Sequence, residues 1–131
     1  MTRYVIDADV ALRLATDRVK VGEGRQLVAP TLIRSELLAA LYRSVRRGEL
    51  TAQQAAERLD FVRGLRLRLL GDRVLQQVAW RVADMLGWED TYEAEYVAVT
   101  MLQADALVTL DDELADAVKG LVEIASVDDL H

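Results

Sequence analysis

The chain opens with the stretch that decides its fold, Thr2-Arg3-Tyr4-Val5-Ile6-Asp7-Ala8-Asp9-Val10. The aromatic and β-branched residues 4–6 predict a buried central strand, and the acidic residue that follows them predicts a turn. In open parallel α/β sheets, ligands bind just beyond the carboxyl ends of the strands. The stretch therefore predicts a carboxylate, that of Asp7, at the edge of a parallel sheet, with Asp9 beside it.

The composition limits the chemistry that the protein can perform. The 131 residues suit a single domain, 1–131, and they include no cysteine and one histidine, His131. Disulfides, thiolate metal sites, histidine acid–base catalysis and multi-histidine zinc sites are therefore excluded. No apolar stretch has the length of a membrane span and no signal-peptide layout is present, so we expect a cytoplasmic protein without a membrane partner.

Charge is distributed unevenly along a chain whose net charge is −6. Residues 43–73 contain eight arginines against four acidic residues, whereas residues 89–116 contain nine acidic residues and no lysine or arginine. Two interpretations fit this pattern. Both segments are solvated faces of opposite sign, or the basic segment binds a phosphate backbone while the acidic segment builds a reactive site.

Strands alternate with helices in the hydrophobic pattern, which predicts a three-layer α/β/α fold around a central, mainly parallel sheet of four to five strands. Further strands are predicted at residues 27–30, 65–70, 106–109 and 122–125, and a tail at 126–131. Helices are predicted at residues 10–15, 31–47, 51–64, 72–86, 90–103 and 111–119.

Several side chains have predicted local roles. Thr31 is expected to cap its helix, and Thr51 with Gln54 has the spacing of a capping box. Met101 and Leu102 are expected to point inward. Trp80 falls on the polar face of its helix, where it either packs on a neighbouring helix or contacts a partner, and we favour packing.

Four acidic residues have positions suited to chemistry. Asp7 and Asp111 each follow a predicted strand, and Glu36 and Glu93 lie on helices beside apolar residues. Clustered carboxylates raise one another's pKa, and a divalent cation relieves that repulsion. Oxygen ligands without histidine or cysteine favour Mg²⁺ or Mn²⁺.

Each acidic residue also has a structural explanation. Asp111 and Asp90 have the position of helix N-caps, and Asp90 with Glu93 has capping-box spacing. Glu36 fits a residue that flanks the core with its carboxylate in water. Asp7 is the hardest to explain structurally, because a carboxylate at the end of a buried strand needs a partner.

The order of four motifs resembles the PIN-domain ribonucleases, and among them the VapC-type toxins of toxin–antitoxin pairs. The resemblance covers nearly the whole chain and is carried by residues 5–9, 35–38, 92–99 and 107–111. It implies that Asp7, Glu36 and Asp111 take the places of the family's acidic site residues, and that Thr109 takes the place of a frequent hydroxyl. It also implies a homodimer.

The chain departs from the family pattern at Glu93, where the family usually has Asp in the motif Tyr-Asp-Ala-x-Tyr. We expect Glu93 to complete the catalytic and metal-binding set, although Asp90 or Asp112 could share that task. Whether the site takes one metal ion or two is left open, as are the cleaved RNA sequence and the identity of the antitoxin.

The resemblance predicts a Mg²⁺- or Mn²⁺-dependent endoribonuclease that is neutralised by a VapB-like antitoxin. The arginine-rich helical hairpin would then hold the backbone of the RNA substrate, a structured RNA loop. One alternative is a PIN-like module that binds RNA or protein without cutting. The other is a signalling receiver domain, which requires a lysine near the end of a late strand, whereas Lys20 and Lys119 lie elsewhere.

Overall fold

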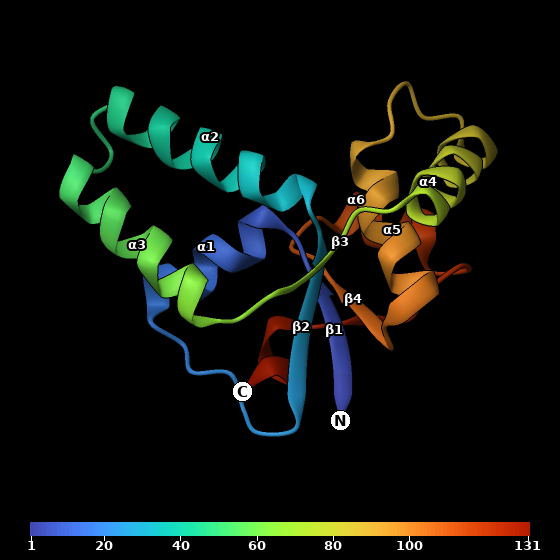
Figure 1. The fold of residues 1–131 in the computed structure, drawn as a ribbon, viewed down its shortest axis with the longest axis horizontal. Helices are drawn as coiled ribbons and strands as arrows, with labels where there is room; N and C mark the ends of the chain where they lie inside the picture. The colour runs from blue at the N-terminus through green and yellow to red at the C-terminus, as the bar shows by residue number, and fades with distance from the viewer.

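Strands and helices alternate in the computed structural model, which describes residues 1–131 (Figure 1). The strands are β1 (Thr2–Ile6), β2 (Arg25–Pro30), β3 (Arg68–Leu70), β4 (Ala106–Val108) and β5 (Ile124–Ala125). The helices are α1 (Ala8–Asp17), α2 (Leu32–Arg46), α3 (Ala52–Gly64), α4 (Arg73–Leu86), α5 (Tyr92–Gln103) and α6 (Asp112–Val118), followed by a 3₁₀ helix at Val127–Leu130.

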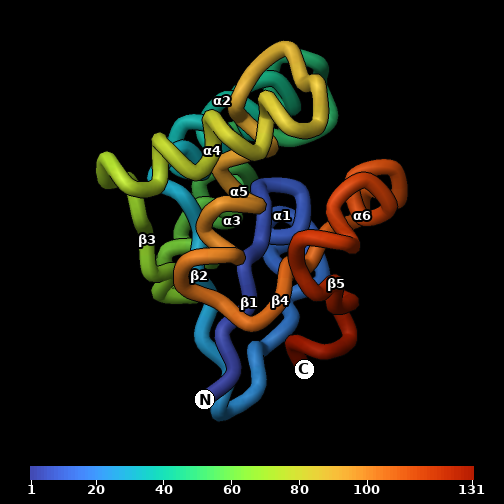
Figure 2. Tube along the Cα trace, turned by 90° about the vertical axis from the view of Figure 1, so that its right-hand side faces the viewer, coloured from blue at the N-terminus to red at the C-terminus, as the bar shows by residue number.

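The five strands form one parallel sheet in the order β3-β2-β1-β4-β5. The opening strand β1 is central and lies between β2 and β4 (Figure 2). Val5 of β1 is opposite Val28 of β2 on one side and Leu107 of β4 on the other. All three side chains are fully buried, and complete burial of such a side chain contributes about 1.5–3 kcal/mol. The predicted parallel α/β sheet is confirmed.

Helices cover both faces of the sheet. Figure 1 shows α1 and α3 on one side and α4 with α5 on the other. Helix α5 contacts β1, β2 and β4, while α1, α2 and α3 pack on one another. One continuous hydrophobic cluster of 26 buried residues joins these layers.

Helix ends follow the local signals of the sequence where a cap is involved. Thr51 and Gln54 form the predicted capping box at the start of α3, with hydrogen bonds of 2.9 and 3.1 Å between each side chain and the other residue's backbone N–H. Asp72 caps α4, and Gly87 ends it with a positive φ of 69°. Thr31 stands at the N-cap of α2 as predicted, but its side chain forms no capping hydrogen bond.

Predicted packing is wrong at three positions. Met101 and Leu102 are 47% and 37% exposed, because the α5 face that meets the sheet carries Tyr96 and Val99 instead. Trp80 is 71% exposed and packs on no neighbouring helix within the chain.

The C-terminal residues are also not the predicted tail. Residues 127–130 form the 3₁₀ helix, and Leu130 at its end is fully buried. The carbonyl oxygen of Leu130 accepts a bond of 2.8 Å from the N–H of Gly22, which fixes this segment to the connection between α1 and β2.

Candidate active site at the carboxyl end of the sheet

Asp7 occupies the turn between β1 and α1. Its Oδ1 accepts a bond of 2.9 Å from the N–H of Val10, which caps α1, and its Oδ2 accepts one of 3.5 Å from the hydroxyl of Thr109. Burial raises the pKa of Asp7 to about 6, and the charges of Asp9 and Glu36 add to that shift, while the two hydrogen bonds oppose it. The carboxylate is therefore costly to hold in its charged form.

Asp111 lies beyond β4, the strand that pairs with β1. It caps α6, because its Oδ1 accepts bonds of 2.9 and 3.2 Å from the N–H groups of Glu113 and Leu114. The N–H of Asp111 donates to the hydroxyl oxygen of Thr109 at 3.1 Å. Since the same hydroxyl donates to Asp7, Thr109 connects the two aspartates across neighbouring strands.

Glu36 reaches the site from α2. Its carboxylate is half-buried and accepts a hydrogen bond from the hydroxyl of Tyr96 on α5. Tyr96 is only 4% exposed, and burial together with Glu36 raises the pKa of its phenol, so that it stays a proton donor. Tyr96 was not predicted as a site residue, although it lies three positions after Glu93, on the same side of a helix.

Glu93 lies in the first turn of α5. Partial burial raises its pKa, and so do the charges of Asp111, Asp90 and Glu36. Asp90 itself accepts a bond of 3.2 Å from the N–H of Tyr92. The capping box predicted for Asp90 and Glu93 does not form, since the helix begins at Tyr92 and no side chain caps it.

The four predicted acidic residues line one cavity. Its volume is about 200 Å³, and it lies where the carboxyl ends of β1 and β4 meet the first turns of α5 and α6. Asp112 is exposed and is not part of this lining. The lining residues are Asp7, Ala8, Asp9, Glu36, Ala40, Arg43, Tyr92, Glu93, Tyr96, Leu107, Asp111 and Leu114.

The donor set fits the chemistry of a hard divalent cation, with an important restriction on geometry. No three acidic side chains are arranged so that they could ligate one ion together. One oxygen of Asp7 and one of Asp111 cap helices, and Glu36 accepts a hydrogen bond from Tyr96. Mg²⁺ commonly keeps several water ligands and binds one or two carboxylates directly. A Mg²⁺ ion in this cavity would therefore be held directly by one or two of the carboxylates.

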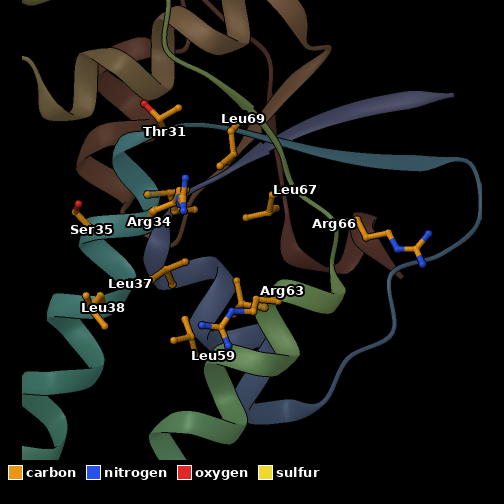
Figure 3. A pocket seen from close by; sticks show the side chains of 12 residues that line it. Thr31, Arg34, Ser35, Leu37, Leu38, Leu59, Arg63, Arg66, Leu67 and Leu69 are labelled. Carbon is orange, nitrogen blue, oxygen red and sulfur yellow. The ribbon is translucent and has the colours of Figure 1, made fainter.

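A second, larger hollow lies away from the acidic residues. This groove, between α2, α3 and β3, has a volume of about 690 Å³. Figure 3 shows Leu37, Leu59 and Leu67 facing one another across it, while Arg66 at its edge points outward. Arg34 and Arg63 also line it. The groove is thus apolar within and basic at its margin.

Two of the arginines of residues 43–73 have partners within the chain. Arg58 donates to the hydroxyl of Thr16 at 2.9 Å, and Arg63 pairs with Asp60 at 2.6 Å. Arg43 is the basic side chain that lines the acidic cavity, and that cavity has no lysine, which the receiver-domain alternative requires.

No helix of the structure has the length and apolar character needed to cross a membrane.

The chain was compared with known proteins. No protein-family model matches the sequence, and no curated protein sequence matches it. The structure of PAE2754 from Pyrobaculum aerophilum is similar, with a TM-score of 0.78 and 29% identity over 97% of this chain and 90% of that one.

Two toxin–antitoxin structures are similar at lower identity. VapBC2 from Rickettsia felis, bound to a DNA fragment from its promoter, gives a TM-score of 0.70 and 10% identity over 95% of this chain and 98% of that one. VapBC-1 from nontypeable Haemophilus influenzae gives a TM-score of 0.67 and 13% identity over 97% of this chain and 99% of that one. The chain therefore has the PIN-domain fold of VapC-type toxins.

Proposed function

We propose that the chain is a Mg²⁺- or Mn²⁺-dependent endoribonuclease and the toxic component of a toxin–antitoxin pair. The observation that carries this proposal is the cavity that Asp7, Glu36, Glu93 and Asp111 share at the carboxyl end of the parallel sheet. A carboxylate with a pKa of about 6 beside other acidic residues gains from a cation, which removes the repulsion among them.

The residues of the cavity have distinct roles in this proposal. Asp7, Glu36, Glu93 and Asp111 would hold the metal ion, and the hydroxyls of Thr109 and Tyr96 would orient the carboxylates of Asp7 and Glu36. The bound ion supplies a water of lowered pKa and neutralises charge on the phosphate. The helix caps fix Asp7 and Asp111 in place before RNA binds, so little reorganisation is needed.

A chelation experiment tests this function. Purified protein is incubated with total RNA in Mg²⁺, in EDTA, and in EDTA followed by excess Mn²⁺. Cleavage should stop in EDTA and return with Mn²⁺. The inactive PIN-like module predicts intact RNA in all three conditions, and the departure at Glu93 is its main support. Cleavage that persists in EDTA would contradict the metal-dependent mechanism.

We further propose that the groove between α2 and α3 receives a segment of an antitoxin. Its apolar interior and basic margin suit a segment that combines apolar and acidic side chains. Leu38→Asp places an acidic group in this apolar surface at a side chain that is already 61% exposed, so the fold should tolerate it. We expect the variant to lose copurification with the product of a neighbouring small gene.

Val74→Asp is the matched control for the groove variant. Val74 is 51% exposed in the first turn of α4, where an acidic side chain suits the helix dipole, and it lies outside the groove. The control should copurify with the partner as the wild type does. If both variants copurify with the partner equally well, the antitoxin does not bind in this groove.

We also expect a homodimer in which Trp80 is a contact. Its indole is 71% exposed on the polar face of α4, and exposed tryptophan is typical of the centres of protein interfaces. Trp80→Glu should convert the dimer to a monomer in light scattering while the circular dichroism stays unchanged. A dimer that persists in the variant would place the interface elsewhere, and a monomeric wild type would weigh against the toxin proposal.

A further inference from the structure

Tyr92 is an exposed aromatic side chain at the junction of three hollows. It lines the acidic cavity, a neighbouring hollow that it shares with Glu36 and Arg43, and a third hollow that it shares with Trp88 and Glu93. The ring is 56% exposed, and its hydroxyl makes no hydrogen bond within the chain. Its backbone N–H is fixed by Asp90 at 3.2 Å, so the ring starts from a defined position at the head of α5.

Arg43 stands on the opposite side of the same hollow, on α2. It lies two helical turns after Glu36 and lines the acidic cavity together with it. The chain contains only two ion pairs, Arg63 with Asp60 and Lys119 with Asp116, so Arg43 forms no ion pair with the nearby carboxylates. Its guanidinium is exposed and free to bind a phosphate.

We propose that Tyr92 and Arg43 hold single-stranded RNA across the acidic cavity, with one base stacked on the tyrosine ring and a backbone phosphate on the guanidinium. This inference rests on the proposed function for its substrate, RNA, and adds the two side chains that hold the unpaired strand. A ring accepts a base only when that base is unpaired, because the faces of paired bases are covered by their neighbours in the duplex. The half-buried indole of Trp88 extends the aromatic surface on the far side of Tyr92.

The electrostatics of the site also favour this arrangement. Acidic residues dominate the cavity and repel phosphates, so an RNA strand needs a basic side chain at the entrance in addition to the cation. Arg43 is the basic residue of the cavity lining and can meet this need. Stacking on Tyr92 adds an attraction that is independent of charge and that any of the four bases can provide.

Binding measurements test the proposal separately from cleavage. The probe is a fluorescently labelled single-stranded RNA of about twelve nucleotides, and the duplex of the same sequence is the comparison. Binding to the Asp7→Asn protein is followed by fluorescence anisotropy with Mg²⁺ present. The single strand should bind at least about tenfold more tightly than the duplex. Equal affinity for the two probes, or binding of neither, would overturn the proposal.

Four variants in that background assign the contacts. Tyr92→Phe keeps the ring and should bind within about twofold of the parent, whereas Tyr92→Ala should weaken binding at least about fivefold. Arg43→Gln should weaken binding and reduce the slope of log affinity against log salt by about one. Tyr42→Ala is the matched control, because Tyr42 is 66% exposed on α2 and lines none of the three hollows.

The outcomes separate this proposal from the proposed function. If Tyr92→Ala binds as tightly as Tyr92→Phe, or if the control loses affinity as strongly, Tyr92 is not the stacking residue and the proposal fails, even if the wild type cleaves RNA. If the single strand binds through Tyr92 and Arg43 and the wild type never cleaves it, this proposal stands and the nuclease function fails.

Discussion

Asp7→Asn is expected to abolish RNA cleavage, lowering the rate at least about a hundredfold, while the protein stays folded. The amide has the size of the carboxylate and retains the oxygen that caps α1 at Val10, so packing and the helix start are preserved. What the variant loses is the negative charge that binds a cation. The measurement is the cleavage rate of a labelled RNA in Mg²⁺, with circular dichroism as the check of the fold.

Asp72→Asn provides a matched control for this variant. Asp72 caps α4 in nearly the same backbone conformation as Asp7: its φ and ψ are −93° and −178°, and those of Asp7 are −96° and −178°. Each aspartate also accepts a hydrogen bond of 2.9 Å from the backbone N–H three residues later. It lies outside the acidic cavity. The control should cleave RNA at the wild-type rate. Wild-type cleavage by Asp7→Asn would instead show that Asp7 is only a helix cap.

Asp7→Asn is also expected to raise the free energy of unfolding at neutral pH when no divalent ion is present. The pKa of Asp7 is about 6 in the folded chain, against 3.8 for an unperturbed aspartate. This group therefore favours folding below pH 3.8, and its contribution is lost as the pH rises through about 6. At about pH 7.5 the charged carboxylate costs on the order of 2–3 kcal/mol of unfolding free energy. Asparagine removes this cost, which corresponds to a melting temperature higher by several degrees.

The pH dependence makes this expectation specific. In EDTA, the difference in melting temperature between Asp7→Asn and the wild type should be largest near pH 7.5 and shrink towards about pH 4, where the aspartate is protonated in the fold. Adding Mn²⁺ should stabilise the wild type more than the variant, because a ligand that binds only the folded state shifts the unfolding equilibrium. Parallel melting curves at every pH, or identical responses to Mn²⁺, would contradict the role of Asp7. Asp72→Asn should follow the wild type in both respects.

Much of the fold could be predicted from the sequence because its signals are local. The continuous apolar run at residues 4–6 predicted a central strand, and the capping box at Thr51 predicted where α3 begins. The prediction that Met101 and Leu102 point inward was wrong. The face that α5 turns inward depends on how this helix packs against α4 and the sheet, which helical spacing alone does not determine. The fixed C-terminal segment depends on a contact with Gly22, far away in the sequence.

The candidate site was predictable in part for the same reason. Asp7 and Asp111 follow neighbouring parallel strands, so the topology brings them together. The hydrogen bond from Tyr96 to Glu36 spans 60 residues and depends on the approach of α2 to α5, which no local pattern encodes. The same approach places Arg43 beside Tyr92, and its importance was therefore hidden among the other arginines of the hairpin.

The pairing of β1 with β4 has a consequence during protein synthesis. Tyr4 lies opposite Ala106, so β1 leaves the ribosome long before β4, the strand that must pair with it before the sheet centre can close. Asp7 therefore meets Asp111 only when most of the chain has been translated, and a truncated nascent chain lacks half of the acidic pair. If the protein is the nuclease proposed above, it cannot cleave RNA before translation has passed Asp111, because until then the site lacks one of its carboxylates.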